Sequence, residues 1–193
     1  MSFDLGKQYR KCWDLIKESR RFIYFIVGIF VLSALVGFFV PAPDALSEQL
    51  LELIRQLMEK TVGMSAGQLV SFIFFNNLLS SIYAIALGIV LGIFPVLASV
   101  ANGYLLGFVG RMAVGEGGLL VLWRILPHGI FELPAVFISF GLGMKLGSFV
   151  WKKKKFETLK KYISEVLRVL ILVVVPLLVV AAAIEGVLIA FAG

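Results

Sequence analysis

The chain has 193 residues, 60% of them hydrophobic, and a formal net charge of +6 at pH 7. A soluble domain is about 45–50% apolar. This composition, with a mean hydropathy of +0.99, therefore excludes an ordinary soluble domain and indicates one integral membrane domain over residues 1–193. Twelve of the 18 Lys and Arg residues lie in residues 7–21 and 152–161, beside apolar segments. The positive-inside rule explains this excess of positive charge, so we expect no nucleic-acid partner.

The chain opens with a basic segment, residues 1–21, whose composition is polar and typical of a helix. The segment is too long and too mixed in charge for a secretory signal peptide, so we expect it to form a cytoplasmic tail. Its Cys12 is the single cysteine of the chain, and we interpret it as an ordinary free thiol. The first span is predicted over residues 22–40, and Pro41 ends it.

An amphipathic helix is predicted over residues 44–61. Apolar residues between Leu46 and Met58 recur at helical spacing, and acidic residues such as Glu52 lie opposite them. This segment is too polar to span a membrane, so we expect it to lie on the outer membrane surface.

The next part of the chain, residues 61–110, carries no charged residue. This stretch is too long for one helix and fits two spans, over residues 69–93 and 96–112. Gly92 and Pro95 mark the turn between them. A re-entrant pair would also have both ends outside, so the charge pattern leaves that alternative open.

The second half of the chain predicts a broken helix. A short loop at residues 111–118 precedes an apolar piece, after which Pro127 starts a span predicted over residues 127–151. A basic loop then leads to the last span, over residues 169–192, which contains Pro176.

The predicted fold is all-α, a polytopic transmembrane helix bundle with about five spans, one broken helix and an outer amphipathic helix. With the N-terminus in the cytoplasm, both basic clusters fall inside and the C-terminus falls outside. We therefore expect a multi-pass protein of the cell membrane that contacts the lipid bilayer. Glycines at four-residue spacing predict close helix packing. They are Gly88, Gly92, Gly103, Gly107, Gly143 and Gly147, to which we add Gly129.

Four ionisable residues in or beside the spans are candidates for function: Arg124, His128, Glu132 and Glu185. Such residues cost about 2.5–3.5 kcal/mol each in a membrane. His128 and Glu132 are four residues apart and share a helix face. Glu132 lies about 30 Å, and Glu185 about 24 Å, from the inner ends of their spans, so both carboxylates fall in the outer half.

Asparagines extend this set of polar residues. Asn77 lies about 12 Å from the outer end of its span, so Asn76 and Asn77 are predicted to share one outward-facing pocket with the histidine and the two glutamates. Asn102 should lie deeper, toward the inner side. A metal ion could be held by His128, Glu132 and Glu185, although the sequence itself assigns no cofactor or metal.

A purely structural interpretation remains open beside this functional one. His128 and Glu132 could form a local hydrogen bond that fixes the helix start, and Arg124 could neutralise a carboxylate. Asn77 and Asn102 could join helices, a contribution worth about 0.6–2 kcal/mol each. Lys145, near the inner end of its span, is expected to extend to the membrane surface.

The residues PHGIFELP at 127–134 resemble the stage II sporulation protein M family of integral membrane proteins. Supporting pieces follow the family order: FFNNLLSS (74–81), GIVLGIFP (88–95), NGYLLG (102–107) and AAAIEG (181–186). The resemblance implies a multi-spanning protein, known by name from a membrane complex that acts in engulfment during sporulation, with no established enzymatic activity. The positions that match the family are Asn77, Asn102, Gly103, His128, Gly129, Glu132 and Glu185.

The sequence argues against most enzyme classes. The zinc-protease motif HExxH needs two histidines, whereas this chain has one, and no GxSxG motif is present. We therefore predict a non-enzymatic scaffold or subunit of a membrane complex, either homo-oligomeric or with other partners. The alternatives are a transporter or channel component with a polar intramembrane site, and a metal-dependent intramembrane hydrolase.

Overall fold

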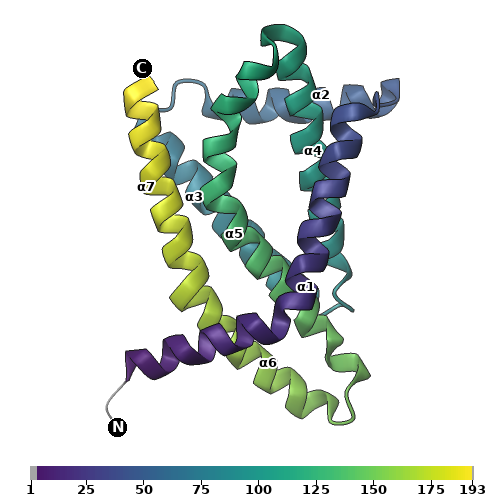
Figure 1. Ribbon diagram of the computed structural model, residues 1–193, viewed down its shortest axis with the longest axis vertical. Helices are drawn as coiled ribbons and strands as arrows, with labels where there is room; N and C mark the ends of the chain where they lie inside the picture. Colours follow the sequence, from purple (N-terminus) through teal and green to yellow (C-terminus); the bar gives the residue numbers. More distant parts are fainter. Residues whose placement is uncertain (1–3, 193) are drawn as a thin grey trace.

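The computed structural model describes the backbone of residues 4–192 and the side chains of residues 4–120 and 132–186. Within these residues the chain is helical and contains no strand, which confirms the predicted all-α class (Figure 1). Five helical segments are long and apolar enough to cross a membrane. The α-helices are α1 (Leu5–Phe39), α2 (Asp44–Thr61), α3 (Ala66–Gly88), α4 (Ile93–Gly117), α5 (Leu122–Gly147), α6 (Lys155–Val169) and α7 (Val175–Ala192).

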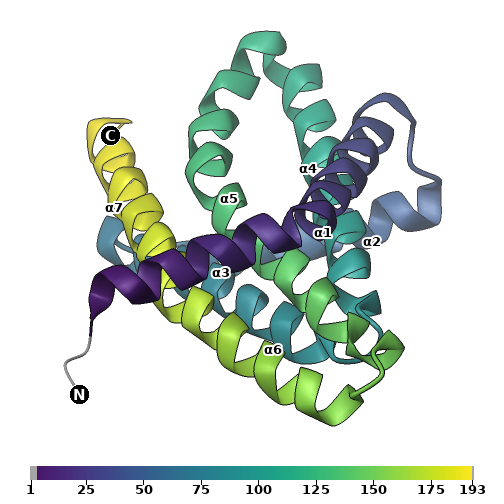
Figure 2. The same ribbon diagram turned by 60° about the horizontal axis from the view of Figure 1, so that its bottom comes forward.

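Helix α1 joins the basic tail and the first apolar segment in one continuous helix. Asp4 caps its N-terminus, because the Asp4 carboxylate accepts a hydrogen bond from the Lys7 backbone N–H at 3.1 Å. It ends at Phe39, because the residue before Pro41 is forced into extended conformation. The N-terminal part of α1 lies crosswise beneath the other helices, and its C-terminal part rises beside α4 (Figures 1 and 2).

Helix α2 has the bounds that its amphipathic pattern predicts, and none of its residues is buried. It lies across the end of the molecule opposite α6 (Figure 1). Leu53 and Met58 on its apolar side are exposed, so within the described chain this side is left without a covering element.

The turn between α3 and α4 lies at residues 89–92, so the predicted ends at 93 and 96 were several residues too late. Leu91 and Gly92 both adopt positive φ angles, of 56° and 69°, and Gly92 precedes the first residue of α4. Pro95 lies in the first helical turn, where its missing N–H breaks no bond. Helix α4 also continues to Gly117, so the loop predicted at residues 111–118 is almost entirely helical.

Two further boundaries differ from the sequence prediction. Helix α5 begins at Leu122 and not at Pro127, so the proline lies inside the helix, where it removes a single hydrogen bond without ending the helix. It is followed by a short 3₁₀ segment, η2 (Ser148–Trp151). The predicted basic loop is largely helical, since α6 begins at Lys155 and buries Tyr162, Val166 and Val169 at helical spacing.

A π-helix, η3 (Leu170–Val174), connects α6 to α7 without a break. The Val175 N–H bonds to the carbonyl of Leu170, five residues earlier. Pro176 follows at once and has no N–H to donate, so the wider turn accommodates the proline inside an otherwise continuous helix.

The predicted close-packing glycines lie where helix backbones meet. An added Cβ on Gly103 or Gly107 would meet the backbone of α1 at Phe30 or Ala34. The second group lies between α3, the following turn and α5, where Gly88 faces Gly143 and Gly92 approaches both Met144 and Gly147. Small residues therefore allow close approach in both contacts. Gly129 lies outside the residues whose side-chain surroundings are described.

Candidate functional site

A cavity of about 330 Å³ lies between α1, α3, α4 and α5, and it collects most of the predicted polar residues. Its wall is largely apolar, with contributions from residues such as Phe30, Leu105 and Val136. The polar side chains in this wall are Asn76, Asn77, Ser80, Asn102 and Glu132. An apolar pocket with a few converging polar groups is the usual form of a binding site.

The centre of this site is a short hydrogen bond between two helices. Asn77 Nδ2 on α3 donates to Glu132 Oε2 on α5 at 2.6 Å. Glu132 is only 7% exposed, so this amide replaces part of the hydration that the carboxylate loses on burial. The bond fixes the carboxylate at one side of the cavity.

Asn102 lies in the same cavity, which corrects the expectation that it would lie deeper. Helix α4 begins at Ile93, three residues before the predicted span, so Asn102 is about 14 Å along it. Asn77 is about 17 Å from the end of α3 at Gly88, which brings the two amides to similar heights. The Asn102 amide donates to the Ala98 carbonyl of its own helix at 2.9 Å.

Of the remaining predicted site residues, Glu185 is the one whose side chain the structure describes. Glu185 is half-buried on α7, next to Gly186, which faces Val70 near the start of α3. It is not among the residues that line the cavity. His128 and Arg124 lie outside the residues whose side chains are described, so their shared site with Glu132 and Glu185 stays a prediction. Among the described side chains, no three His, Cys, Asp or Glu residues form a group able to hold a metal ion.

Sequence reasoning missed a buried charge at the basic end of the bundle. Lys145 was expected to extend to the membrane surface, but its side chain is only 3% exposed. Its Nζ lies 3.1 Å from Glu18 Oε1 on α1 and 5.2 Å from the ring centre of Tyr162 on α6. Burial raises the pKa of Tyr162, and the carboxylates of Glu18 and Glu165 raise it further, so the ring stays neutral beneath the ammonium group.

Comparisons with known proteins identify the family. The family model described as stage II sporulation protein M matches residues 24–188. An uncharacterized protein of Methanocaldococcus jannaschii is 29% identical over 183 residues, which cover 88% of this chain and 81% of that protein. No solved structure matches the chain. Because the family model spans most of the sequence, including Asn77, Asn102 and Glu132, the resemblance seen in the sequence is confirmed: the chain belongs to the stage II sporulation protein M family.

Proposed function

We propose that the protein is a non-enzymatic subunit of a membrane complex, and that another transmembrane helix covers its polar cavity. The observation that carries this proposal is the exposure of Asn76 and Asn102 on two apolar helices. Asn76 lies about 15 Å and Asn102 about 14 Å along helices that are each long enough to cross a membrane. An amide at this depth facing hydrocarbon loses its hydrogen bonds to water, so a neighbouring helix would stabilise it.

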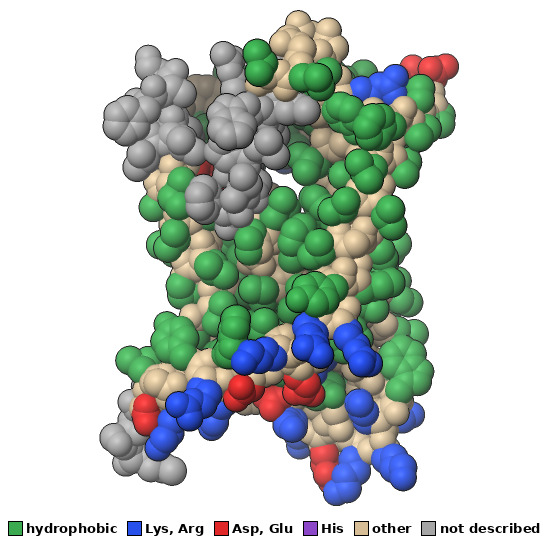
Figure 3. All heavy atoms as spheres, viewed as in Figure 1, with side chains coloured by type: hydrophobic (Ala, Val, Ile, Leu, Met, Phe, Trp, Pro, Cys, Tyr) green, Lys and Arg blue, Asp and Glu red, His purple; other side chains and the backbone are tan. Residues whose placement is uncertain are grey.

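The proposed arrangement in the membrane has five spans and a cytoplasmic N-terminus. Figure 3 shows a band of hydrophobic side chains across the middle of this face, with Lys and Arg gathered below it over α1 and α6. Both basic clusters therefore lie at one end, as the positive-inside rule requires for a common cytoplasmic side. Helix α2, at the opposite end, would then lie on the outer surface with its apolar side in the lipid interface.

Photo-crosslinking in native membranes tests the covered cavity. A photoreactive residue replaces Asn102, and the control replaces Val100, an exposed residue of the same helix that does not line the cavity. We expect a discrete protein adduct from position 102, at twice the chain mass for a second copy, and only lipid adducts from position 100. With the probe at Leu106, the double variant Asn76→Leu/Asn102→Leu should reduce the adduct several-fold. Lipid adducts alone at position 102 would contradict the proposal.

Introduced cysteines test the proposed orientation. In a Cys12→Ala background, Lys7→Cys, Lys153→Cys and Glu48→Cys each place a thiol at an exposed position. A membrane-impermeant maleimide should label the Glu48→Cys variant in sealed cells and the other two only after permeabilisation. The reverse pattern would invert the orientation, and labelling of all three in sealed cells would contradict the five-span arrangement.

A second candidate function is the handling of a cation or small polar substrate, which the buried Glu132 carboxylate in the cavity favours. The substitution Glu132→Gln separates the two candidates, because a glutamine oxygen can still accept from Asn77 while the charge is lost. A scaffold should keep its crosslinked adduct and its cellular function in this variant. A component that handles ions should keep the adduct and lose the function.

A further inference from the structure

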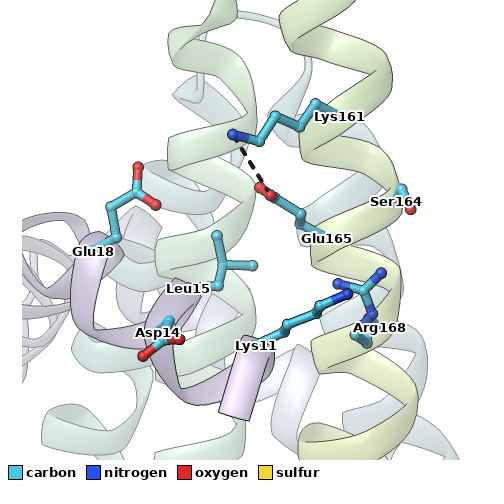
Figure 4. Close-up of a pocket in the computed structure, with 8 residues that line it drawn as sticks. All are labelled: Lys11, Asp14, Leu15, Glu18, Lys161, Ser164, Glu165 and Arg168. Carbon is cyan, nitrogen blue, oxygen red and sulfur yellow. Dashed lines mark ion pairs between the residues drawn. The ribbon is translucent and has the colours of Figure 1, made fainter. Parts of the chain in front are cut away.

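A second cavity, of about 420 Å³, lies at the basic end of the bundle between the N-terminal part of α1 and α6 (Figure 4). It is distinct from the cavity at Glu132, because the two share no lining residue. Its wall contains three cationic and three acidic side chains: Lys11, Lys161, Arg168, Asp14, Glu18 and Glu165.

Internal pairs account for only part of this charge. Lys161 Nζ lies 3.8 Å from Glu165 Oε1, and the Glu18 carboxylate forms an ion pair with Lys145. Neither Lys11 nor Arg168 forms an ion pair within 4 Å with any carboxylate of the described residues. In Figure 4 these two side chains extend toward one another from opposite walls, while the Asp14 carboxylate points away from them.

Two cations that face one another across a cavity repel each other unless an anion lies between them. A phosphate group suits this pair, because the planar guanidinium can bind two phosphate oxygens and the lysine ammonium adds a point charge.

The position of Arg168 indicates where such a phosphate comes from. Arg168 lies at the end of α6, and Ile171, three residues later on the same face, is 63% exposed at the start of the apolar segment. Trp13 on α1 is also exposed, as aromatic residues at the membrane interface commonly are. A headgroup in the cavity would therefore have an apolar surface beside it for its acyl chain.

We propose that Lys11 and Arg168 bind the phosphate group of a phospholipid from the leaflet at the basic end of the bundle. A bound lipid would hold the crosswise part of α1 against α6, because one phosphate group would contact a cation on each of the two helices. The site is independent of the cavity at Glu132, so each proposal can fail without the other.

The test uses the purified full-length protein in an uncharged detergent, with thermal unfolding followed by tryptophan fluorescence. The additives are dioleoylphosphatidylglycerol, dioleoylglycerol, glycerol 3-phosphate and inorganic phosphate. We expect phosphatidylglycerol to raise the Tm and dioleoylglycerol, which lacks the phosphate, to leave it unchanged. The double variant Lys11→Gln/Arg168→Gln should bind the phospholipid at least about tenfold more weakly. The control Lys7→Gln/Lys153→Gln removes the same charge from exposed positions outside the cavity and should respond like the wild type.

Native mass spectrometry supplies a second measurement that does not depend on unfolding, since it counts lipids retained by the folded variants. Equal lipid retention in the wild type and in the Lys11→Gln/Arg168→Gln variant would overturn the proposal, as would an equal loss in the control. A Tm rise with inorganic phosphate or glycerol 3-phosphate that equals the rise with phospholipid would overturn the lipid source. That result would mean that the same two cations bind a soluble phosphate compound.

Discussion

The ammonium group of Lys145 lies 3.1 Å from the carboxylate of Glu18 and connects the last turns of α5 to the crosswise part of α1. Glu18 is largely exposed whereas Lys145 is buried, so the pair stabilises the fold mainly by compensating the buried charge. We expect Glu18→Gln to lower the free energy of unfolding by about 1–2 kcal/mol, after allowance for solvent screening at the exposed carboxylate.

Thermal unfolding in detergent measures this effect, and Glu157→Gln is its matched control. Glu157 pairs with Lys154 at 2.9 Å, but both side chains are exposed, so that substitution should leave the Tm unchanged. In a Lys145→Met background, Glu18→Gln should have no further effect. An equal loss in both backgrounds would show that Glu18 acts through another contact.

The hydrogen bond from Asn77 to Glu132 should stabilise the packing of α3 on α5. Asn77→Leu removes the donor from a buried carboxylate, and we expect a loss of about 1–3 kcal/mol in the free energy of unfolding. Asn102→Leu is the control, because among the described residues that amide bonds only within its own helix, and it is exposed. Thermal unfolding of the isolated protein should separate the two variants, and equal Tm shifts would contradict an interhelical role for Asn77.

Close packing of α4 on α1 should depend on Gly107. In Gly107→Ala the new methyl group would overlap the backbone at Ala34, so α4 must move away, at a cost of about 1–3 kcal/mol. Gly28→Ala, in the middle of α1, has open space for its methyl group and should be neutral or stabilising by about 0.5–1 kcal/mol. The Tm of each variant measures the difference. An unchanged Tm in Gly107→Ala would contradict the close contact between α4 and α1.

The thiol of Cys12 should react slowly with maleimides even in permeabilised cells. Cys12 is 2% exposed, and burial raises the pKa of its thiol while the Arg168 charge lowers it in part. A smaller thiolate fraction is then present at neutral pH, and the labelling rate should rise at higher pH than for the exposed thiol of a Lys7→Cys variant. Equal labelling rates for Cys12 and for the thiol of the Lys7→Cys variant at every pH tested would show that Cys12 is accessible.

The bounds of a helix can follow from the local sequence, whereas the residue that a side chain contacts on another helix cannot be predicted in this way. The bounds of α2 could be predicted because its leucines repeat at helical spacing between Pro43 and the following loop. The pairing of Glu18 with Lys145 joins residues 127 positions apart, and no spacing rule on one helix reveals such a contact. The predicted end of α3 was five residues too late and the predicted start of α4 three residues too late, and together these errors misplaced Asn102 relative to Asn77, since each residue adds about 1.5 Å along a helix.

The π-helix at Leu170–Val174 has a consequence for how relatives of this chain align. A π turn is equivalent to one extra residue inserted in an α-helix, and the helices on both sides keep their orientation. A family member without that residue would align here with a one-residue gap inside an unbroken apolar helix. Its counterpart of Glu185 would still point to the same side of the bundle. A gap of this kind in the last helix therefore marks a change of local winding and is not evidence for a loop.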